Sequence, residues 1–264
     1  MRLAVAALLC MLPVPPVAAQ GVRYDTGLSV ASGEYGTSET STAITWNHGI
    51  ALAWRRVTLR ATMPLVAQRG PAVLSGGGTV PGRGEEGMPG GGGPRRALST
   101  DTSVHEYRVR AGDPYVTVSL RAYESVRTSV SAGASVKAPV ADAGDIGTGE
   151  WDAGALLEVS RHLAGPWFAA AGGSWWKLGD PEGLDLHDPV IGTLMLSRVG
   201  EGSAASLTLE AGTSTLEGFD PPVSAGALVT RDLWGGNAGL SATIGLTESA
   251  ADFSVGLSWG VGLR

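Results

Sequence analysis

The sequence has few of the features that build disulfide-linked or helical membrane proteins. It contains one cysteine, Cys10, among 264 residues. Only 17% of the residues are charged, and the net charge of −6 leaves no basic surplus for binding nucleic acid. Beyond the N-terminal segment, no stretch offers the roughly 20 consecutive apolar residues that a membrane-spanning helix needs. A membrane location would therefore require a closed barrel of strands.

The N-terminal segment has the pattern of a secretory signal peptide. A basic residue precedes an apolar run and then small residues, so we expect cleavage after Ala19. The signal would cover residues 1–19 and the mature chain residues 20–264. Because Cys10 lies inside the signal, the mature chain would have neither a disulfide nor a cysteine metal site. Lipid modification of Cys10 is the alternative, which the bulky Leu9 before it disfavours.

What the sequence has in abundance is glycine, with 40 residues, and alternation of apolar with small or polar residues. From Phe253 to Leu263, large apolar residues alternate with serine and glycine, as in a strand whose side chains point to opposite faces. A soluble sandwich would carry charged or β-branched groups on its second face, whereas this second face is bare. The pattern fits lipid on one side and a confined polar lumen on the other.

The same period-two pattern recurs along the mature chain and predicts about twelve strands. They are expected near residues 26–34, 41–54, 57–65, 115–123, 126–137, 151–162, 165–177, 188–198, 206–211, 222–231, 237–246 and 253–263. Most have roughly the 9–11 residues that a tilted strand needs to cross the hydrocarbon layer. Tryptophans near the expected strand ends fit an aromatic girdle. We therefore predict an all-β fold, a single antiparallel transmembrane β-barrel in the outer membrane of a Gram-negative bacterium.

The links between the expected strands alternate in length. Every second link, beginning with Arg55-Arg56, is short, whereas most of the others are longer. Bacterial outer-membrane barrels have short periplasmic turns and longer outside loops, so we expect both termini in the periplasm. The longest link, at about 67–114, is rich in glycine. It predicts either a plug or gate that folds into the barrel or a solvated outside loop.

Charged residues at lumen-facing positions are the candidates for selecting a solute. These candidates are Arg60, Arg121, Arg127, Lys137, Asp152, Glu158, Glu210 and Asp252. The basic ones lie on the third to fifth expected strands, and the acidic ones lie on the sixth, ninth and twelfth. One interpretation is a field across the lumen, basic on one wall and acidic on the other, that orients a small polar or zwitterionic solute. The alternative is a set of ion pairs that fill a narrow lumen.

Two other patterns in the sequence are candidates for a metal site and for a hydrolase site. Two expected outside loops, over 142–150 and 180–188, are rich in acidic residues, and calcium prefers such oxygen ligands. Neither spacing matches an EF-hand loop, so we expect a solvated acidic surface, no metal and no other cofactor. A lipid hydrolase would need a serine and a histidine held together, and Ser160 and His162 are the best candidates. No nucleophile motif surrounds them, so we expect no enzymatic activity.

The stretch SVKAPVADAGDIGTGEWD resembles a family of outer-membrane barrels usually labelled as transporters or as meta-pathway phenol-degradation proteins. The matching residues are Val136, Lys137, Ala138, Pro139, Asp142, Gly147, Thr148, Gly149, Glu150 and Asp152. In that family a lysine-proline strand end leads to a Gly-Thr-Gly loop and to an acidic residue that opens the next strand. Residues 110–113 and 178–181 resemble two further loops of the family.

The resemblance implies a passive outer-membrane channel or transporter for small solutes, either aromatic or polar. The partners of such a channel would be outer-membrane lipid, the solute and, during biogenesis, periplasmic chaperones and the barrel-assembly machinery. One alternative is a closed barrel that serves as a structural or adhesive surface protein. A third hypothesis is an outer-membrane lipid-modifying enzyme.

Overall fold

The computed structural model describes residues 21–36, 38–70, 73–75, 95–97, 104–141, 149–180 and 185–263. No helix within these ranges is long and apolar enough to cross a bilayer. The strands are β1 (Gly21–Gly33), β2 (Ser41–Trp54), β3 (Val57–Gly70), β4 (Val73–Ser75), β5 (Arg95–Ala97), β6 (Val104–Ala111), β7 (Tyr115–Glu124), β8 (Thr128–Lys137), β9 (Asp152–His162), β10 (Trp167–Lys177), β11 (Val190–Gly200), β12 (Ser203–Gly212), β13 (Val223–Leu233), β14 (Gly236–Gly245) and β15 (Phe253–Leu263).

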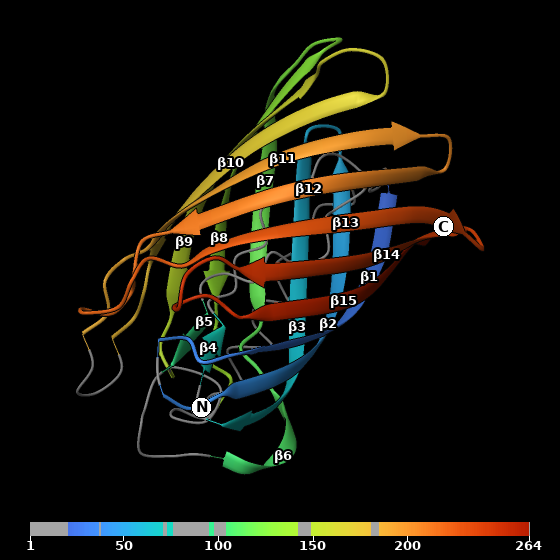
Figure 1. Ribbon diagram of the computed structural model, residues 1–264. Helices are drawn as coiled ribbons and strands as arrows, with labels where there is room; N and C mark the ends of the chain where they lie inside the picture. The colour runs from blue at the N-terminus through green and yellow to red at the C-terminus, as the bar shows by residue number, and fades with distance from the viewer. Residues whose placement is uncertain are drawn as a thin grey trace.

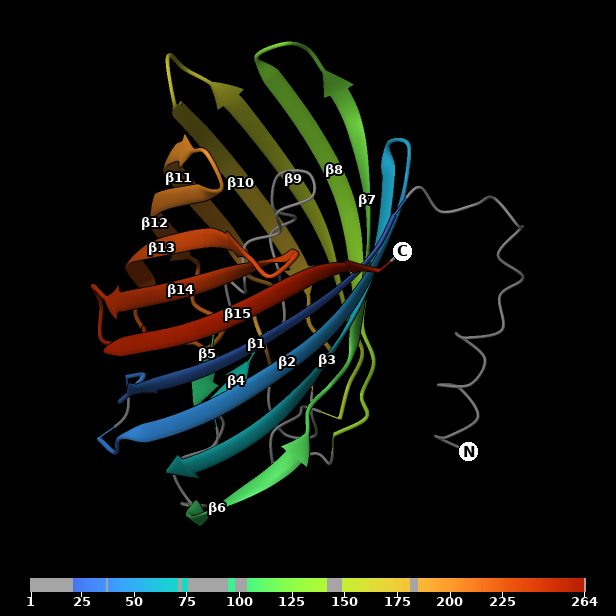
Figure 2. The same ribbon diagram turned by 90° about the vertical axis from the view of Figure 1, so that its right-hand side faces the viewer.

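Twelve of these strands form one closed antiparallel barrel (Figure 1, Figure 2). Neighbouring strands pair in the order β2-β1-β15-β14-β13-β12-β11-β10-β9-β8-β7-β3, and β2 pairs with β3 to complete the circle. The first and last strands meet in this wall, since Val22 lies opposite Leu263 and Ser32 lies opposite Phe253. The prediction of an antiparallel barrel of about twelve strands is confirmed.

The alternation in the sequence gives the barrel an apolar outside and a polar inside. In β15, Phe253 and Leu257 are exposed on the outer surface, whereas Ser254 and Ser258, which follow each of them, line an interior cavity. Strand β9 shows the most regular alternation, because every second side chain is buried from Asp152 to Ser160. A barrel with lipid outside and a polar lumen inside requires these two faces.

The two ends of the barrel differ in their connections. At one end, which we call the short-turn end, five turns of two to four residues join β2–β3, β7–β8, β9–β10, β11–β12 and β13–β14. The opposite end carries the longer connections and is called the long-loop end. In the β13–β14 turn, Trp234 and Gly235 have φ angles of 48° and 75°. Two positive φ angles are the geometry that a tight two-residue hairpin favours, because its twist matches that of the strands.

The glycine-rich link predicted at about 67–114 is shorter in the structure, because part of it is strand. Strand β3 continues to Gly70, and β6 pairs with this extension, with Leu65 opposite Ala111 and Gln68 opposite Arg108. Strands β6 and β7 therefore follow each other along β3. The glycines and prolines of the link dominated the sequence pattern and obscured the short alternation of Tyr107, Val109 and Ala111.

The rest of this link contains a separate small sheet formed by β4 and β5. Two perpendicular views place this sheet within the outline of the barrel (Figure 1, Figure 2). Residues 71–72, 76–94 and 98–103 lie outside the described residues. Most of the segment predicted to act as a plug, a gate or a solvated loop therefore lies outside them too.

Four of the eight tryptophans occupy positions expected of an aromatic girdle. Trp151 and Trp175 are exposed near the long-loop end, and Trp167 and Trp234 are exposed at the short-turn end. Trp176 differs, because its side chain is only 4% exposed and packs with Leu178, Leu186 and Ile191. Adjacent residues of one strand point to opposite faces, so Trp175 and Trp176 cannot both face lipid.

Replacing Leu257 by lysine should test which face of β15 meets lipid. Leu257 lies near the middle of the strand and is 60% exposed on the outer surface. A lysine on the lipid face near the bilayer midplane costs about 2–4 kcal/mol. Equilibrium unfolding by urea in lipid vesicles would measure the loss. Ser258→Lys is the matched control, because Ser258 points into the lumen, and an equal loss in both variants would refute the assignment of the faces.

Candidate functional site: the barrel lumen

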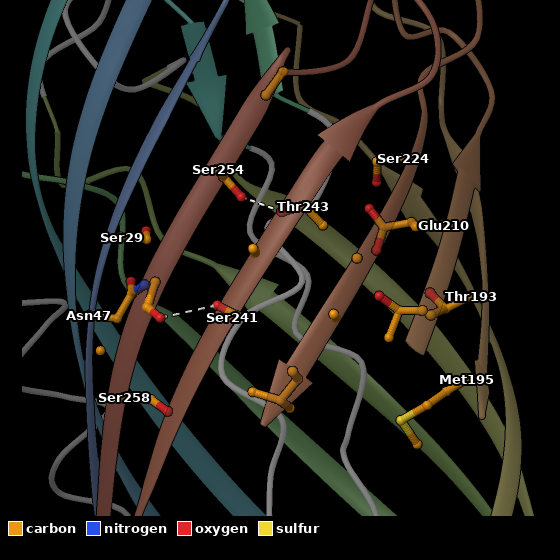
Figure 3. Close-up of a pocket in the computed structure, with 18 of the residues that line it drawn as sticks. Ser29, Asn47, Thr193, Met195, Glu210, Ser224, Ser241, Thr243, Ser254 and Ser258 are labelled. Atoms are coloured by element: carbon orange, nitrogen blue, oxygen red, sulfur yellow. Dashed lines mark hydrogen bonds between the residues drawn. The ribbon is translucent and has the colours of Figure 1, made fainter. Parts of the chain in front are cut away.

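A cavity of about 320 Å³ lies inside the barrel, and every strand of the wall except β8 contributes to its lining. Half of the lining residues are glycine, serine, threonine or asparagine. Figure 3 shows Ser29, Asn47, Thr193, Met195, Glu210, Ser224, Ser241, Thr243, Ser254 and Ser258 around this space. Small inward side chains keep the wall thin, which leaves room that larger residues would fill in a barrel of this size.

Hydroxyl groups on neighbouring strands bond to each other or to the backbone. Thr243 bonds to Ser254, and Ser241 donates to the carbonyl of Gly256 at 3.5 Å (Figure 3). By contrast, the buried hydroxyls of Tyr35 and Thr193 have no hydrogen-bond partner among the described residues. Both residues line the cavity. Water or a solute in the cavity can supply the partner that a buried hydroxyl needs.

One wall of the lumen carries a cluster of three charges. The carboxylate of Asp25 accepts from Arg23 Nε and from Arg60 Nη1, each at 2.6 Å. The side chains are between 22% and 26% exposed. Gly260 lies so close to Arg23 and Asp25 that a Cβ there would overlap them. The cluster contains two cations and one anion, so it leaves one formal positive charge on the β1–β3 side.

The opposite side of the lumen carries two carboxylates. Glu158 on β9 and Glu210 on β12 both line the cavity. In the ring of twelve strands, β11 lies six positions from β2, and β9 and β12 stand on either side of β11. Glu210 lies directly opposite Thr193 in the register. These positions separate the two glutamates from the cluster around Asp25.

Lys137 and Asp152, for which the sequence left open opposite walls or ion pairing, are neighbours and form an ion pair. They are register partners on β8 and β9, with Lys137 Nζ 2.8 Å from Asp152 Oδ2. The same Nζ lies 3.1 Å from Asp113 Oδ2. All three side chains are at most 6% exposed and do not line the cavity. The pair forms because β8 and β9 are adjacent, although a long loop separates these residues along the chain.

The other oxygens of this cluster accept hydrogen bonds from backbone amides of two connections at the long-loop end. Asp113 Oδ1 accepts from the amides of Val140 and Ala141, each at 2.9 Å. Asp152 Oδ1 accepts from the amide of Gly179 at 3.0 Å. Each carboxylate oxygen therefore has a donor, as a buried ion needs. The cluster ties together the loops that follow β6, β8 and β10.

Three other candidates lie outside the central lumen. Arg121 pairs with Glu124 at 3.2 Å near the short-turn end. Arg127 is exposed in the turn before β8, and Asp252 is exposed directly before β15. Both were expected on strands, and neither lies on one. Each residue directly precedes the first residue of a strand, so the alternation in the sequence continues one residue beyond the strand itself.

The family-like stretch is described only in part. Val136 faces outward at 46% exposure, Pro139 is half-buried, and Glu150 is exposed. Gly149 has a φ of 73°, which favours glycine. Residues Asp142, Gly147 and Thr148 lie outside the described residues. The sequence analysis did not identify Arg23, Asp25 and Tyr35 as site residues, and it placed Asp113 only in a family-like loop. Continuing the alternation of β1 towards the N-terminus would have revealed Arg23 and Asp25.

The proposed hydrolase pair is not assembled in the structure. His162 Nε2 donates to the carbonyl of Gly165 at 2.8 Å, and its ring packs on Phe168 at 4.7 Å. Ser160 is buried on the inner face of β9. For metals, no group of three or more histidine, cysteine or acidic residues is placed to hold an ion within the described ranges. Much of the acidic segment 142–150 lies outside those ranges.

No family model matches the chain, and no curated protein matches it in sequence. The structure is similar to the COG4313 outer membrane channel from Pseudomonas putida F1, with a TM-score of 0.69, 13% identity, and coverage of 95% of this chain and 100% of that one. It is also similar to the NanC porin, with a TM-score of 0.54, 8% identity, and coverage of 91% and 100%.

A third similar structure is the beta domain of the Bordetella autotransporter BrkA, with a TM-score of 0.51, 14% identity, and coverage of 92% and 99%. At these identities the likeness establishes the fold, which is that of outer-membrane β-barrels. Two of these proteins are named as a channel or porin and one as part of an autotransporter. The choice of function therefore depends on the lumen of this chain.

Replacing Lys137 by methionine should strongly destabilise the barrel. The change leaves Asp113 and Asp152 buried without their shared cation, and breaking a buried ion pair in this way costs about 3–5 kcal/mol. Unfolding by urea in detergent micelles would measure the difference. Lys177→Met is the control, because Lys177 is 60% exposed and pairs with Asp188 at 3.4 Å. Its expected effect is within about 1 kcal/mol, and similar losses in the two variants would argue against the cluster as a structural anchor.

Proposed function

We propose that this protein is an outer-membrane channel for the passive passage of small solutes. The short-turn end would face the periplasm, with both chain termini there, and the long-loop end would face outside. Short turns on the periplasmic side are the rule in bacterial outer-membrane barrels. Periplasmic chaperones and the barrel-assembly machinery would deliver such a protein to the membrane.

The main observation behind this proposal is the cavity that the closed wall of strands encloses. Eleven strands line it, and most of the lining side chains are serine, threonine, glycine or charged residues. A barrel that served only as a surface scaffold would have no need for small inward residues on so many strands. The similarity to an outer-membrane channel of Pseudomonas putida supports the proposal but is not its main evidence.

The charges across the lumen support passage of a polar solute. The cluster of Arg23, Asp25 and Arg60 is positive by one unit, and Glu158 and Glu210 contribute two negative charges on the other side. Opposed charges across a narrow pore orient a dipolar or zwitterionic solute and exclude poorly matched ions. Because the sum is negative by one unit, the pore should also prefer small cations over anions.

The second candidate is a closed surface barrel. It is favoured by the pairing of Arg60 with Asp25 inside the cavity, since paired charges can fill a lumen as well as line it. The two candidates differ in whether ions cross the barrel. Conductance therefore separates them directly.

The test is single-channel conductance of the refolded mature protein in a planar bilayer. We expect steady conductance with a reversal potential in a salt gradient that indicates cation preference. Glu158→Gln combined with Glu210→Gln should move that reversal potential towards anions, because the net lumen charge becomes positive. The matched control is Glu201→Gln with Glu217→Gln, two exposed residues outside the cavity lining, which should leave the selectivity unchanged.

The absence of conductance in folded native protein would overturn the channel proposal and favour the closed barrel. Conductance with an unchanged reversal potential in the lumen variant would retain the channel but reject the role of the two glutamates. Folding of each variant can be checked by the faster migration of unheated barrels on a denaturing gel.

A further inference from the structure

The outer face of the barrel carries three arginines at the short-turn end. Arg161 on β9, Arg198 on β11 and Arg231 on β13 are all exposed. Each lies two residues after an exposed apolar residue on the same face of its strand. Those apolar residues are Val159, Leu196 and Val229. The arginines therefore mark the edge of the apolar band, where the hydrocarbon layer gives way to headgroups.

The register shows that the three arginines follow one line around the barrel. Ala169 on β10 is the register partner of both Arg161 on β9 and Leu196 on β11. Arg198 lies two residues beyond Leu196, towards the short-turn end. The same step recurs on the next strands. Ala205 on β12 is the register partner of both Arg198 and Val229, and Arg231 lies two residues beyond Val229. A constant step of this kind is what tilted strands produce at a constant height on the barrel. Adjacent arginines are two strands apart, or about 10 Å.

None of these arginines forms an ion pair with a carboxylate within the described part of the chain. Asp232, the neighbour of Arg231, accepts from Asn237 Nδ2 at 3.0 Å instead. The indole of Trp167, which is the register partner of Arg198, is exposed beside it. Tryptophan favours the headgroup level of a bilayer, which supports this depth for the arginines.

We propose that Arg161, Arg198 and Arg231 form a binding surface for the phosphate groups of anionic phospholipids in the leaflet at the short-turn end. Guanidinium groups bind phosphate oxygens through two parallel hydrogen bonds, and they keep their charge at any physiological pH. The surface covers only β9 to β13, so it would hold lipids along one flank. This inference uses the proposed orientation but does not depend on conduction, so lipid binding and conductance can fail separately.

The test is native mass spectrometry of the refolded protein in detergent, with phosphatidylglycerol or phosphatidylcholine added at equal concentration. We expect selective retention of phosphatidylglycerol. Each arginine near an anionic headgroup should contribute about fivefold to retention. Arg198→Gln with Arg231→Gln should therefore reduce phosphatidylglycerol binding by about 25-fold. The matched control is Arg56→Gln with Arg127→Gln, two exposed turn arginines at the same end, which should change binding by less than about twofold.

Equal retention of the two lipids by the native protein would overturn the proposal. An equal loss in the control would also overturn it, because binding would then reflect overall positive charge rather than this surface. Arg198→Lys with Arg231→Lys keeps the charge and should retain most of the binding. That variant also shows whether the positions tolerate substitution, since gel mobility reports folding for each protein.

Discussion

The hydrogen-bonding demand of the backbone is the constraint on which the rest of this structure depends. In hydrocarbon, an unpaired amide or carbonyl costs several kcal/mol, so a sheet that spans a membrane has to close on itself. Here the closure is the pairing of β1 with β15 along most of their length. Closure creates an interior, and only an enclosed interior allows residues such as Glu158 and Arg60 to lie within the depth of the membrane.

The charges inside the barrel fall into two groups that differ in their exposure to the cavity. Lys137, Asp113 and Asp152 are almost fully buried, and the two aspartates accept hydrogen bonds from the backbone amides of loops. Arg23, Asp25 and Arg60 are partly exposed to the cavity and remain accessible to ions and solutes. Both groups contain paired charges, so pairing alone does not distinguish a structural cluster from a selective one; exposure to the lumen does.

Much of the fold follows from the sequence, because the period of two is set by strand geometry and applies to each strand independently. The strand from Phe253 to Leu263 was predicted with its observed bounds. The sequence failed to predict a strand where glycine and proline interrupt the alternation of apolar and polar residues. Gly112 and Pro114 separate β6 from β7, and the glycine-rich link hid β6. The faces of residues follow from the alternation, and Arg60, Glu158 and Glu210 line the cavity.

The partners of these residues could not be predicted from the alternation. Asp25 meets Arg60 across β2, and Asp113 meets Lys137 from a connection whose path the sequence does not specify. Pairing of this kind depends on register and loop conformation, which period-two patterns leave open. The outward arginines show the same limit, because their alignment depends on the stagger between strands.

The short turns at one end also bear on the order in which the chain folds. They divide the barrel into five local hairpins and leave β1 and β15 as single strands at the two chain ends. Contacts within a hairpin close small loops and form early, whereas contacts between distant segments form slowly. We expect the seam between β1 and β15 to form last. Until then, two long unpaired edges would be open to other chains, which is a reason for such a protein to be escorted before it reaches the membrane.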